Sequence, residues 1–309
     1  MLARFKAAAV HAAPVFLDSQ ATTEKAISIM REAARAGAEL IAFPETYIPA
    51  FPVWAALWPP IDNHDLFVRM AAQSVSADGP EVARLCAEAR ALGVTVSIGI
   101  SERSAVSVGG LWNSNLLIGE TGEILVHHRK LVPTFYEKLV WSSGDGAGLV
   151  VAETRQGRIG GLICGENTNP LARFALMAQG EQVHISSWPP MWPTRRPAGG
   201  GNFDNVAANR IRASAHCFEA KVFGIVTAGY MDEPMRAFLI ERDRTIADVI
   251  DRTPRAASFF VDPTGVVFGD ELQDQEGIAY AEIDLNRCVE PKQFHDVVGY
   301  YNRDRKSVV

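Results

Sequence analysis

Short apolar segments alternate with segments whose apolar residues recur every three or four positions in the first third of the chain. Uninterrupted apolar runs of about four to eight residues are typical of buried strands, whereas the wider spacing is typical of amphipathic helices. Glycine or proline follows several of these segments and favours their termination. The pattern therefore predicts strands at 4–10, 40–43 and 94–100 and helices at 26–37 and 82–93.

The rest of the chain adds strand–turn–strand units and further helix–strand units. Hairpin turns are expected at 120–122, 156–157 and 263–265, helices at 167–180 and 203–220, and strands at 182–188 and 222–228. By contrast, the aromatic and proline-rich segment 47–60 is too irregular for a regular element. No flexible linker interrupts the alternation, so the expected fold is a single layered α/β domain with helices covering stacked sheets.

Composition narrows the class of protein. Of 309 residues, 48% are hydrophobic and 21% charged, which is typical of a globular chain. The formal net charge of −6 disfavours a nucleic-acid partner. No apolar run reaches the roughly 18 residues of a membrane span, and the N-terminus lacks the long apolar centre of a signal peptide. These features predict a cytoplasmic protein without a membrane partner.

Four cysteines lie far apart, without the spacing of a zinc site, so free thiols are expected. Cys86 shares the apolar face of a helix, and Cys217 and Cys288 resemble core residues. Cys164 differs because it ends the apolar run 159–163, between two glycines and just before a helix that Asn169-Pro170 announces. A thiol at such a turn would be exposed, and the helix dipole would lower its pKa. This local pattern fits a nucleophile and a core cysteine equally.

Two charged residues occupy similar places. Glu45 follows an apolar strand and a proline, where partial burial would raise its pKa and make it a proton acceptor. Lys130 follows the strand at 124–126. Taken alone, each has a simpler interpretation, a solvated loop glutamate for Glu45 and a surface turn for Lys130, since most basic runs are solvated. The neighbouring His127 and His128 point to opposite faces of an extended strand, so we expect no metal site from them. Because strand ends converge on one pocket in layered α/β folds, a thiol, a carboxylate and an ammonium there would form a set for acyl transfer.

Three segments carry a resemblance to a known family. FPETYIPAFP, HRKLVPTFYEKLVWSSGDG and GGLICGENTNPLARFALMAQGEQVHISSWP resemble the signature blocks of the nitrilase branch of the carbon–nitrogen hydrolase superfamily. The resemblance implies a four-layer αββα sandwich and a catalytic triad of Glu45, Lys130 and Cys164, assisted by Glu137. It also implies a homo-oligomer, a dimer or a larger spiral, and a reaction without metal or organic cofactor. On this basis we divide the chain into a hydrolase domain at 1–285 and a tail at 286–309 that is a candidate oligomer interface.

One position departs from the family pattern. Many nitrilases carry tryptophan directly after the nucleophile, where this chain has Gly165. The missing indole removes an apolar wall or leaves its place to another aromatic residue. Candidates for the walls of a substrate pocket are Tyr47, Trp54, Trp58, Trp141, Trp188 and Trp192.

The function that this resemblance implies is hydrolysis of a small-molecule nitrile to a carboxylic acid and ammonia through a cysteine thioimidate and thioester. An amidase or carbamoyl hydrolase on the same triad, and an enzyme that converts the nitrile to an amide, are the nearest alternatives. A non-catalytic binding protein of the same fold is a third.

Overall fold

Two six-stranded sheets form the centre of the molecule, which the computed structural model describes for residues 2–196 and 199–301. The first sheet has the order β12-β1-β2-β3-β4-β5 and the second has the order β11-β10-β9-β8-β7-β6. The strands are β1 (Arg4–His11), β2 (Ala38–Ala42), β3 (Thr95–Arg103), β4 (Leu111–Ile118), β5 (Ile124–Arg129), β6 (Ala152–Thr154), β7 (Gly157–Ile163), β8 (Val183–Trp188), β9 (Phe223–Ala228), β10 (Ser258–Val261), β11 (Val267–Leu272) and β12 (Gly277–Asp284).

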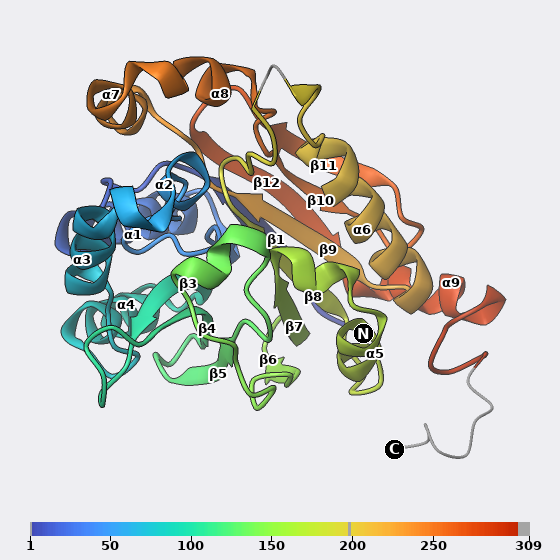
Figure 1. Cartoon of the computed structure of the whole chain (residues 1–309). Coiled ribbons are helices and arrows are strands. Elements are labelled where there is room, and N and C mark those ends of the chain that lie inside the picture. The colour runs from blue at the N-terminus through green and yellow to red at the C-terminus, as the bar shows by residue number, and fades with distance from the viewer. Residues whose placement is uncertain (1, 197–198, 302–309) are drawn as a thin grey trace.

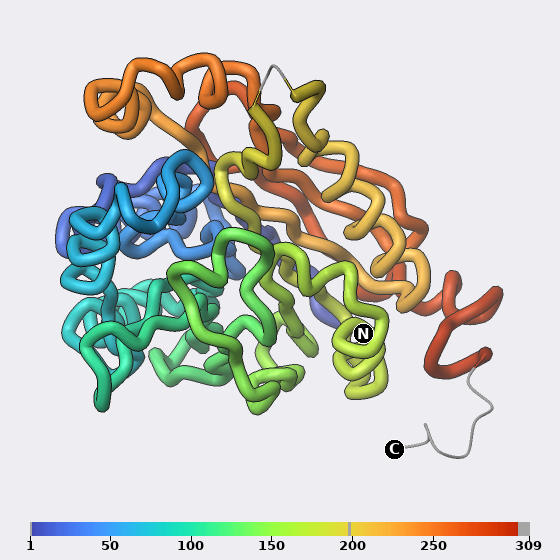
Figure 2. The backbone as a smooth tube through the Cα atoms, viewed as in Figure 1, coloured from blue at the N-terminus to red at the C-terminus, as the bar shows by residue number. Residues whose placement is uncertain are grey.

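Helices cover the outer face of each sheet, which gives the predicted αββα sandwich (Figure 1). The helices α1 and α4 pack on the first sheet, and α5 and α6 pack on the second. The tube in Figure 2 shows these pairs on opposite sides of the strands. The helices are α1 (Ser19–Arg35), α2 (Trp54–Leu57), α3 (His64–Gln73), α4 (Pro80–Leu92), α5 (Pro170–Met177), α6 (Asn205–Ala220), α7 (Glu233–Arg242), α8 (Ala247–Arg252) and α9 (Val289–Phe294).

The alternation of side chains along β1 shows how the layers are held together. Ala8 and Val10 belong to the core beneath α1 and α4, whereas Phe5, Ala7 and Ala9 belong to the core between the sheets. A strand places successive side chains on opposite faces, so an all-apolar strand fits only between two apolar layers. The continuous apolar runs in the sequence follow from this double burial.

One buried hydroxyl links the two sheets. Thr227 in β9 donates toward the carbonyl oxygens of Val10 in β1 and Ala42 in β2, at 2.7 and 3.2 Å. A hydrogen bond inside an apolar layer fixes the relative position of the groups it joins, because breaking it leaves buried polar atoms unpaired. The two sheets are therefore held in register by contacts more specific than apolar packing.

The predicted strands and helices are present, although α1 begins at Ser19 and not near residue 26. Segment 47–60, predicted to be irregular throughout, contains the one-turn helix α2, and the helices α3, α7, α8 and α9 and the strand β12 were not predicted. The buried residues of α5 are Ala172, Leu176 and Met177, whereas Leu171 is 78% exposed. Asn169 caps the start of this helix, since its side chain accepts from the N–H groups of residues 171 and 172.

Within the described residues, no helix combines the length and apolar character that crossing a membrane requires. The predicted tail beyond 285 begins with a 3-10 turn and α9, and it is described as far as Tyr301. Residues 302–309 of that tail lie outside the described part of the chain.

Candidate active site

Cys164 directly follows β7 and begins a 3-10 turn that runs from Cys164 to Thr168. Its φ of 50° lies in the left-handed region, which non-glycine residues seldom adopt. Such backbone conformations cost free energy and persist where the surrounding structure enforces them, often at functional sites. The Cys164 turn is therefore built to hold this side chain in one place.

The prediction of an exposed thiolate at a helix end is wrong. Cys164 is 6% exposed, and α5 begins only at Pro170, after the 3-10 turn. Burial and the nearby Glu45 raise the pKa of the Cys164 thiol, and the charge of Lys130 only partly opposes this rise. At neutral pH the side chain is a thiol that needs a base.

Lys130 connects two carboxylates. Its Nζ donates to Glu45 Oε1 at 2.8 Å and to Glu137 Oε2 at 2.6 Å, and all three side chains are fully buried. Burial lowers the pKa of Lys130, but the negative charges of the surrounding acidic groups, Glu137 and Glu45 among them, outweigh it and raise the pKa well above the ordinary value. Lys130 is therefore a permanent cation between the two carboxylates.

Glu45 has one oxygen engaged and one unengaged. Its Oε1 accepts from Lys130 and from Asn113 Nδ2, the latter at 2.7 Å, while Oε2 is buried without a partner among the described residues. Burial raises the pKa of Glu45 to about 7, and Lys130 limits the rise. A carboxyl group with this pKa exchanges protons readily at neutral pH.

The structure brings the predicted residues together from three strand ends. Glu45 follows β2, Lys130 follows β5 and Cys164 follows β7. The Cys164 Sγ and one carboxylate oxygen each of Glu45 and Glu137 all lie within 4.8 Å of one another. This spacing also suits metal ligands, but the Lys130 ammonium already supplies the positive charge between the carboxylates.

The loop after β2 comes close to β3 at Gly99. A Cβ atom at this position would lie 2.3 Å from the Thr46 nitrogen, so only glycine allows the approach. The backbone of the neighbouring Glu45 therefore lies close to β3, and the Glu45 side chain is buried.

Glu137 has a second structural role that the sequence did not reveal. Its Oε2 accepts from the Thr134 N–H at 3.0 Å and so forms a capping box at the start of the 3-10 turn Phe135–Leu139. Beside it, Tyr136 is buried, and its hydroxyl has no partner among the described residues. Burial and the charge of Glu137 raise the pKa of Tyr136 well above its ordinary value, so the phenol stays neutral.

Glu166 connects the segment that contains Lys130 to the turn that begins at Cys164. Its carboxylate accepts from His128 Nε2 at 2.9 Å, from the Ile163 N–H at 2.8 Å and from the Leu131 N–H. The adjacent His127 contacts Glu102 instead, which confirms that the two histidines point in opposite directions. Sequence reasoning missed Glu166, although a glutamate two residues after the nucleophile was the available signal.

A buried network of hydrogen-bonded side chains also contacts the turn that begins at Cys164. Asn167 Nδ2 donates to the carbonyl of Cys164 at 3.0 Å, and Asn167 Oδ1 lies 2.8 Å from His184 Nε2. His184 Nδ1 and His216 Nε2 each lie 2.7 Å from Glu181, one on each carboxylate oxygen. Because these groups are buried and bonded to one another, they fix the orientation of the turn. The histidine inside the apolar run 182–188 was the signal for it.

A small cavity opens at the Cys164 side chain. Its volume is about 40 Å³, and its lining residues include Cys164, Gly165 and Trp188. Of the six aromatic residues predicted as candidates for its walls, Trp188 and Trp192 lie there. Tyr47 donates to the Ala13 carbonyl, and Trp141 donates to Ser101 Oγ.

Trp54 is buried in the core cluster around Tyr136 and Trp141, and Trp58 donates to Asp243 Oδ2 at 3.0 Å. These placements correct the sequence assignment, since aromatic side chains near Glu45 in the sequence pack into the core instead of the cavity.

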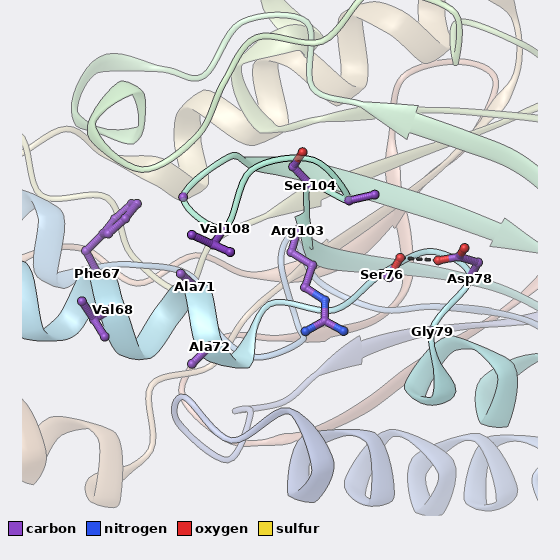
Figure 3. Close-up of a pocket in the computed structure, with 12 residues that line it drawn as sticks. Phe67, Val68, Ala71, Ala72, Ser76, Asp78, Gly79, Arg103, Ser104 and Val108 are labelled. Carbon is purple, nitrogen blue, oxygen red and sulfur yellow. Dashed lines mark hydrogen bonds between the residues drawn. The ribbon is translucent and has the colours of Figure 1, made fainter.

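A larger hollow of about 810 Å³ lies between α3 and the loop after β3 and contains none of the predicted catalytic residues (Figure 3).

Gly165 stands where many nitrilases have tryptophan, and the structure shows little room for a side chain. A Cβ atom at Gly165 would lie 2.8 Å from Thr134 Oγ1. Trp192 lines the same cavity together with Trp188. Aromatic walls are therefore present, but later segments of the chain supply them.

Comparison with known proteins agrees with this arrangement. The carbon–nitrogen hydrolase family model matches residues 6–293. The chain belongs to the carbon–nitrogen hydrolase family. An arylacetonitrilase from Hypocrea virens is 35% identical over 303 residues, covering 96% of this chain and 88% of that protein.

Other relatives extend this result. An aliphatic nitrilase from Rhodococcus rhodochrous is also 35% identical, over 97% of this chain and 80% of that protein. The solved structure of a carbon–nitrogen hydrolase from Helicobacter pylori G27 matches with a TM-score of 0.73 at 19% identity, covering 98% of this chain and 96% of that one. The fold of this carbon–nitrogen hydrolase is therefore that of its family.

Proposed function

We propose that this carbon–nitrogen hydrolase is a nitrilase that converts an organic nitrile into a carboxylic acid and ammonia. The observation that carries the proposal is the buried cluster in which Lys130 contacts Glu45 and Glu137 beside the Cys164 thiol. The arylacetonitrilase and the aliphatic nitrilase that resemble the chain support nitriles as the substrate class. We assign Cys164 as nucleophile, Glu45 as general base and acid, and Lys130 as stabiliser of negative charge.

The first half of the reaction attaches the substrate to the enzyme. Glu45 takes the thiol proton while Cys164 Sγ bonds to the nitrile carbon, and negative charge develops on the nitrile nitrogen. The Lys130 ammonium stabilises that charge. The nitrogen takes the proton that Glu45 carries, which gives a neutral thioimidate and returns Glu45 to its carboxylate form.

The second half consumes two water molecules. Glu45 removes a proton from the first water as its oxygen bonds to the thioimidate carbon, and proton transfer to nitrogen allows ammonia to leave and a thioester to form. A second water, activated in the same way, releases the carboxylic acid and restores the Cys164 thiol. Glu137 holds Lys130 in place through the 2.6 Å contact. If the first tetrahedral intermediate expels the thiol instead of ammonia, the product is an amide.

The experiment that tests this function measures ammonia, acid and amide from aliphatic, aromatic and arylacetonitrile substrates and from the matching amides. We expect ammonia and acid from at least one nitrile, with the matching amide hydrolysed more slowly. Turnover of amides without turnover of any nitrile would contradict the proposal and support an amidase on the same triad. Absence of turnover on every substrate would favour a binding protein.

The pH dependence of this reaction follows from Glu45. Since the base must be ionised and its pKa is raised to about 7, kcat/KM is expected to fall as the pH drops through this value. At pH 5 the rate should be about 100-fold below its plateau, because each pH unit below the pKa costs a factor of ten. Initial rates between pH 5 and 9, with circular dichroism to verify folding, measure the profile.

Asn113 offers a variant that moves this profile. Its amide donates to Glu45 and favours the ionised form, so Asn113→Ala is expected to shift the midpoint to higher pH. A profile that is flat to pH 5 in the folded protein would refute the role of Glu45 as base.

We also propose a homo-oligomer and a cytoplasmic location. The oligomer is supported by Phe294, Tyr300 and Tyr301, which are 63%, 56% and 66% exposed in the C-terminal segment. Exposed aromatic groups of this kind favour contact with a second chain.

A further inference from the structure

Arg212 is a partly buried guanidinium in the wall of the Cys164 cavity. It projects from α6, and its Nε donates to Thr168 Oγ1 at 2.7 Å. Its Cζ lies 5.3 Å from the centre of the Trp188 ring and 5.6 Å from that of the Phe203 ring. Its Nη1 donates to Asn209 Oδ1 at 3.3 Å. The guanidinium is therefore held in position by aromatic side chains, a hydroxyl and an amide oxygen.

No carboxylate among the described residues lies within ion-pair distance of Arg212. Two residues earlier on the same helix, Arg210 is paired with Glu271, as expected for an arginine near other charges. A cation that is removed from water without an opposite charge costs free energy. Departures of this kind from ordinary packing are expected at functional sites. The missing partner of Arg212 is therefore a candidate for part of the substrate.

Other polar groups in the cavity lining are also suited to bind a ligand that accepts hydrogen bonds. Trp188 and Trp192 each have a buried indole N–H without a partner among the described residues. The amides of Asn205 and Asn209 are engaged, with Pro254 and Arg212 respectively, and the lining includes neither aspartate nor glutamate. A site with one cation and two unused indole donors favours a ligand that accepts hydrogen bonds and carries negative charge.

The shape of the Arg212 side chain favours a carboxylate as that ligand group. The planar end of a guanidinium binds a carboxylate through two parallel hydrogen bonds.

We propose that the substrate is a nitrile that carries a carboxylate, and that Arg212 binds this carboxylate while the nitrile carbon lies at Cys164. The inference rests on the proposed nitrilase function and names its substrate class. Arg212 acts as a specificity-determining residue, because a neutral nitrile of the same shape leaves its charge without a partner.

The test compares 3-cyanopropanoate with 3-cyanopropanamide, a neutral analogue of nearly the same shape. The ratio of their kcat/KM values for nitrile hydrolysis should favour the anion, and Arg212→Gln should lower this ratio by about 10- to 100-fold, as expected for loss of a charged hydrogen bond. Arg212→Lys should restore part of it, since the charge remains without the planar fork. Arg210→Gln is the matched control and should leave the ratio unchanged.

Two outcomes would overturn the inference. One is a wild-type enzyme that hydrolyses the amide-bearing nitrile at least as well as the anion. The other is an Arg212→Gln enzyme in which the ratio of the two kcat/KM values is unchanged. Arg212 would then affect both substrates equally and would not recognise the carboxylate.

Calorimetry separates this inference from the proposed reaction. The Cys164→Ala variant should bind 3-cyanopropanoate, and the Cys164→Ala/Arg212→Gln double variant should bind it about 10- to 100-fold more weakly. Binding that depends on Arg212, together with absence of hydrolysis in the wild type, would contradict the nitrilase function and still support anion recognition. Absence of binding and of hydrolysis of the anion would contradict the inference.

Discussion

Replacement of Cys164 by alanine is expected to abolish release of acid and ammonia, with kcat lowered at least about 10⁴-fold, as for loss of a covalent nucleophile. The physical reason is that neither Glu45 nor Lys130 supplies a group that bonds to the nitrile carbon. Because only one sulfur atom is removed from a small cavity, the fold should persist. Ammonia release and thermal unfolding of the same samples measure the two effects.

Cys86→Ala is the matched control, since Cys86 is half-buried on α4 and belongs to the core away from the cavity. It should retain the turnover of the wild type. Hydrolysis at the wild-type rate in folded Cys164→Ala would contradict the covalent mechanism.

Replacement of Lys130 by methionine should cost both activity and stability. The variant leaves Glu45 and Glu137 buried without the cation that contacts both. Removing one partner of a buried ion pair typically lowers the free energy of unfolding by about 3–5 kcal/mol. Urea unfolding at pH 8, followed by circular dichroism, measures this loss, and nitrile hydrolysis should fall below detection.

The stability loss in Lys130→Met should depend on pH in a definite direction. Burial already raises the pKa of Glu45 to about 7, and loss of the ammonium removes the charge that opposes this rise. A carboxyl whose folded pKa exceeds its unfolded value contributes stability at low pH that is lost as the pH rises. The deficit relative to wild type should therefore be smaller at pH 5 than at pH 8.

Lys138→Met serves as the control, because Lys138 is exposed and close in sequence. It should change the unfolding free energy by less than about 0.5 kcal/mol. A Lys130→Met deficit that is equal at both pH values would contradict the proposed coupling to Glu45.

Local patterns predicted stacked sheets covered by helices, and they directed attention to Glu45, Lys130 and Cys164 because each lies just after a predicted strand. The family resemblance was needed to specify the αββα order and to combine the three residues into a triad. Convergence at strand ends is a property of the layered fold and needs no side-chain detail. The family resemblance added Glu137, which no local pattern distinguishes from a surface glutamate.

The walls of the cavity were harder to predict, because they depend on packing between distant segments. Trp141 donates to Ser101, and Tyr47 donates to Ala13, so each indole or phenol is directed by a partner that the sequence does not reveal. Arg212 drew no attention because its helix shows no unusual pattern. Its significance arises only from the absence of a carboxylate in the described surroundings.

The proposed reactive groups come from both sheets, and this links the site to the packing between them. Glu45 and Lys130 follow strands of the first sheet, whereas Cys164 follows a strand of the second. The buried layer between the sheets, including the Thr227 hydroxyl that joins them, therefore fixes the distance from the proposed base to the proposed nucleophile. A substitution in this layer that shifts one sheet against the other is expected to slow the reaction even though it lies far from the substrate.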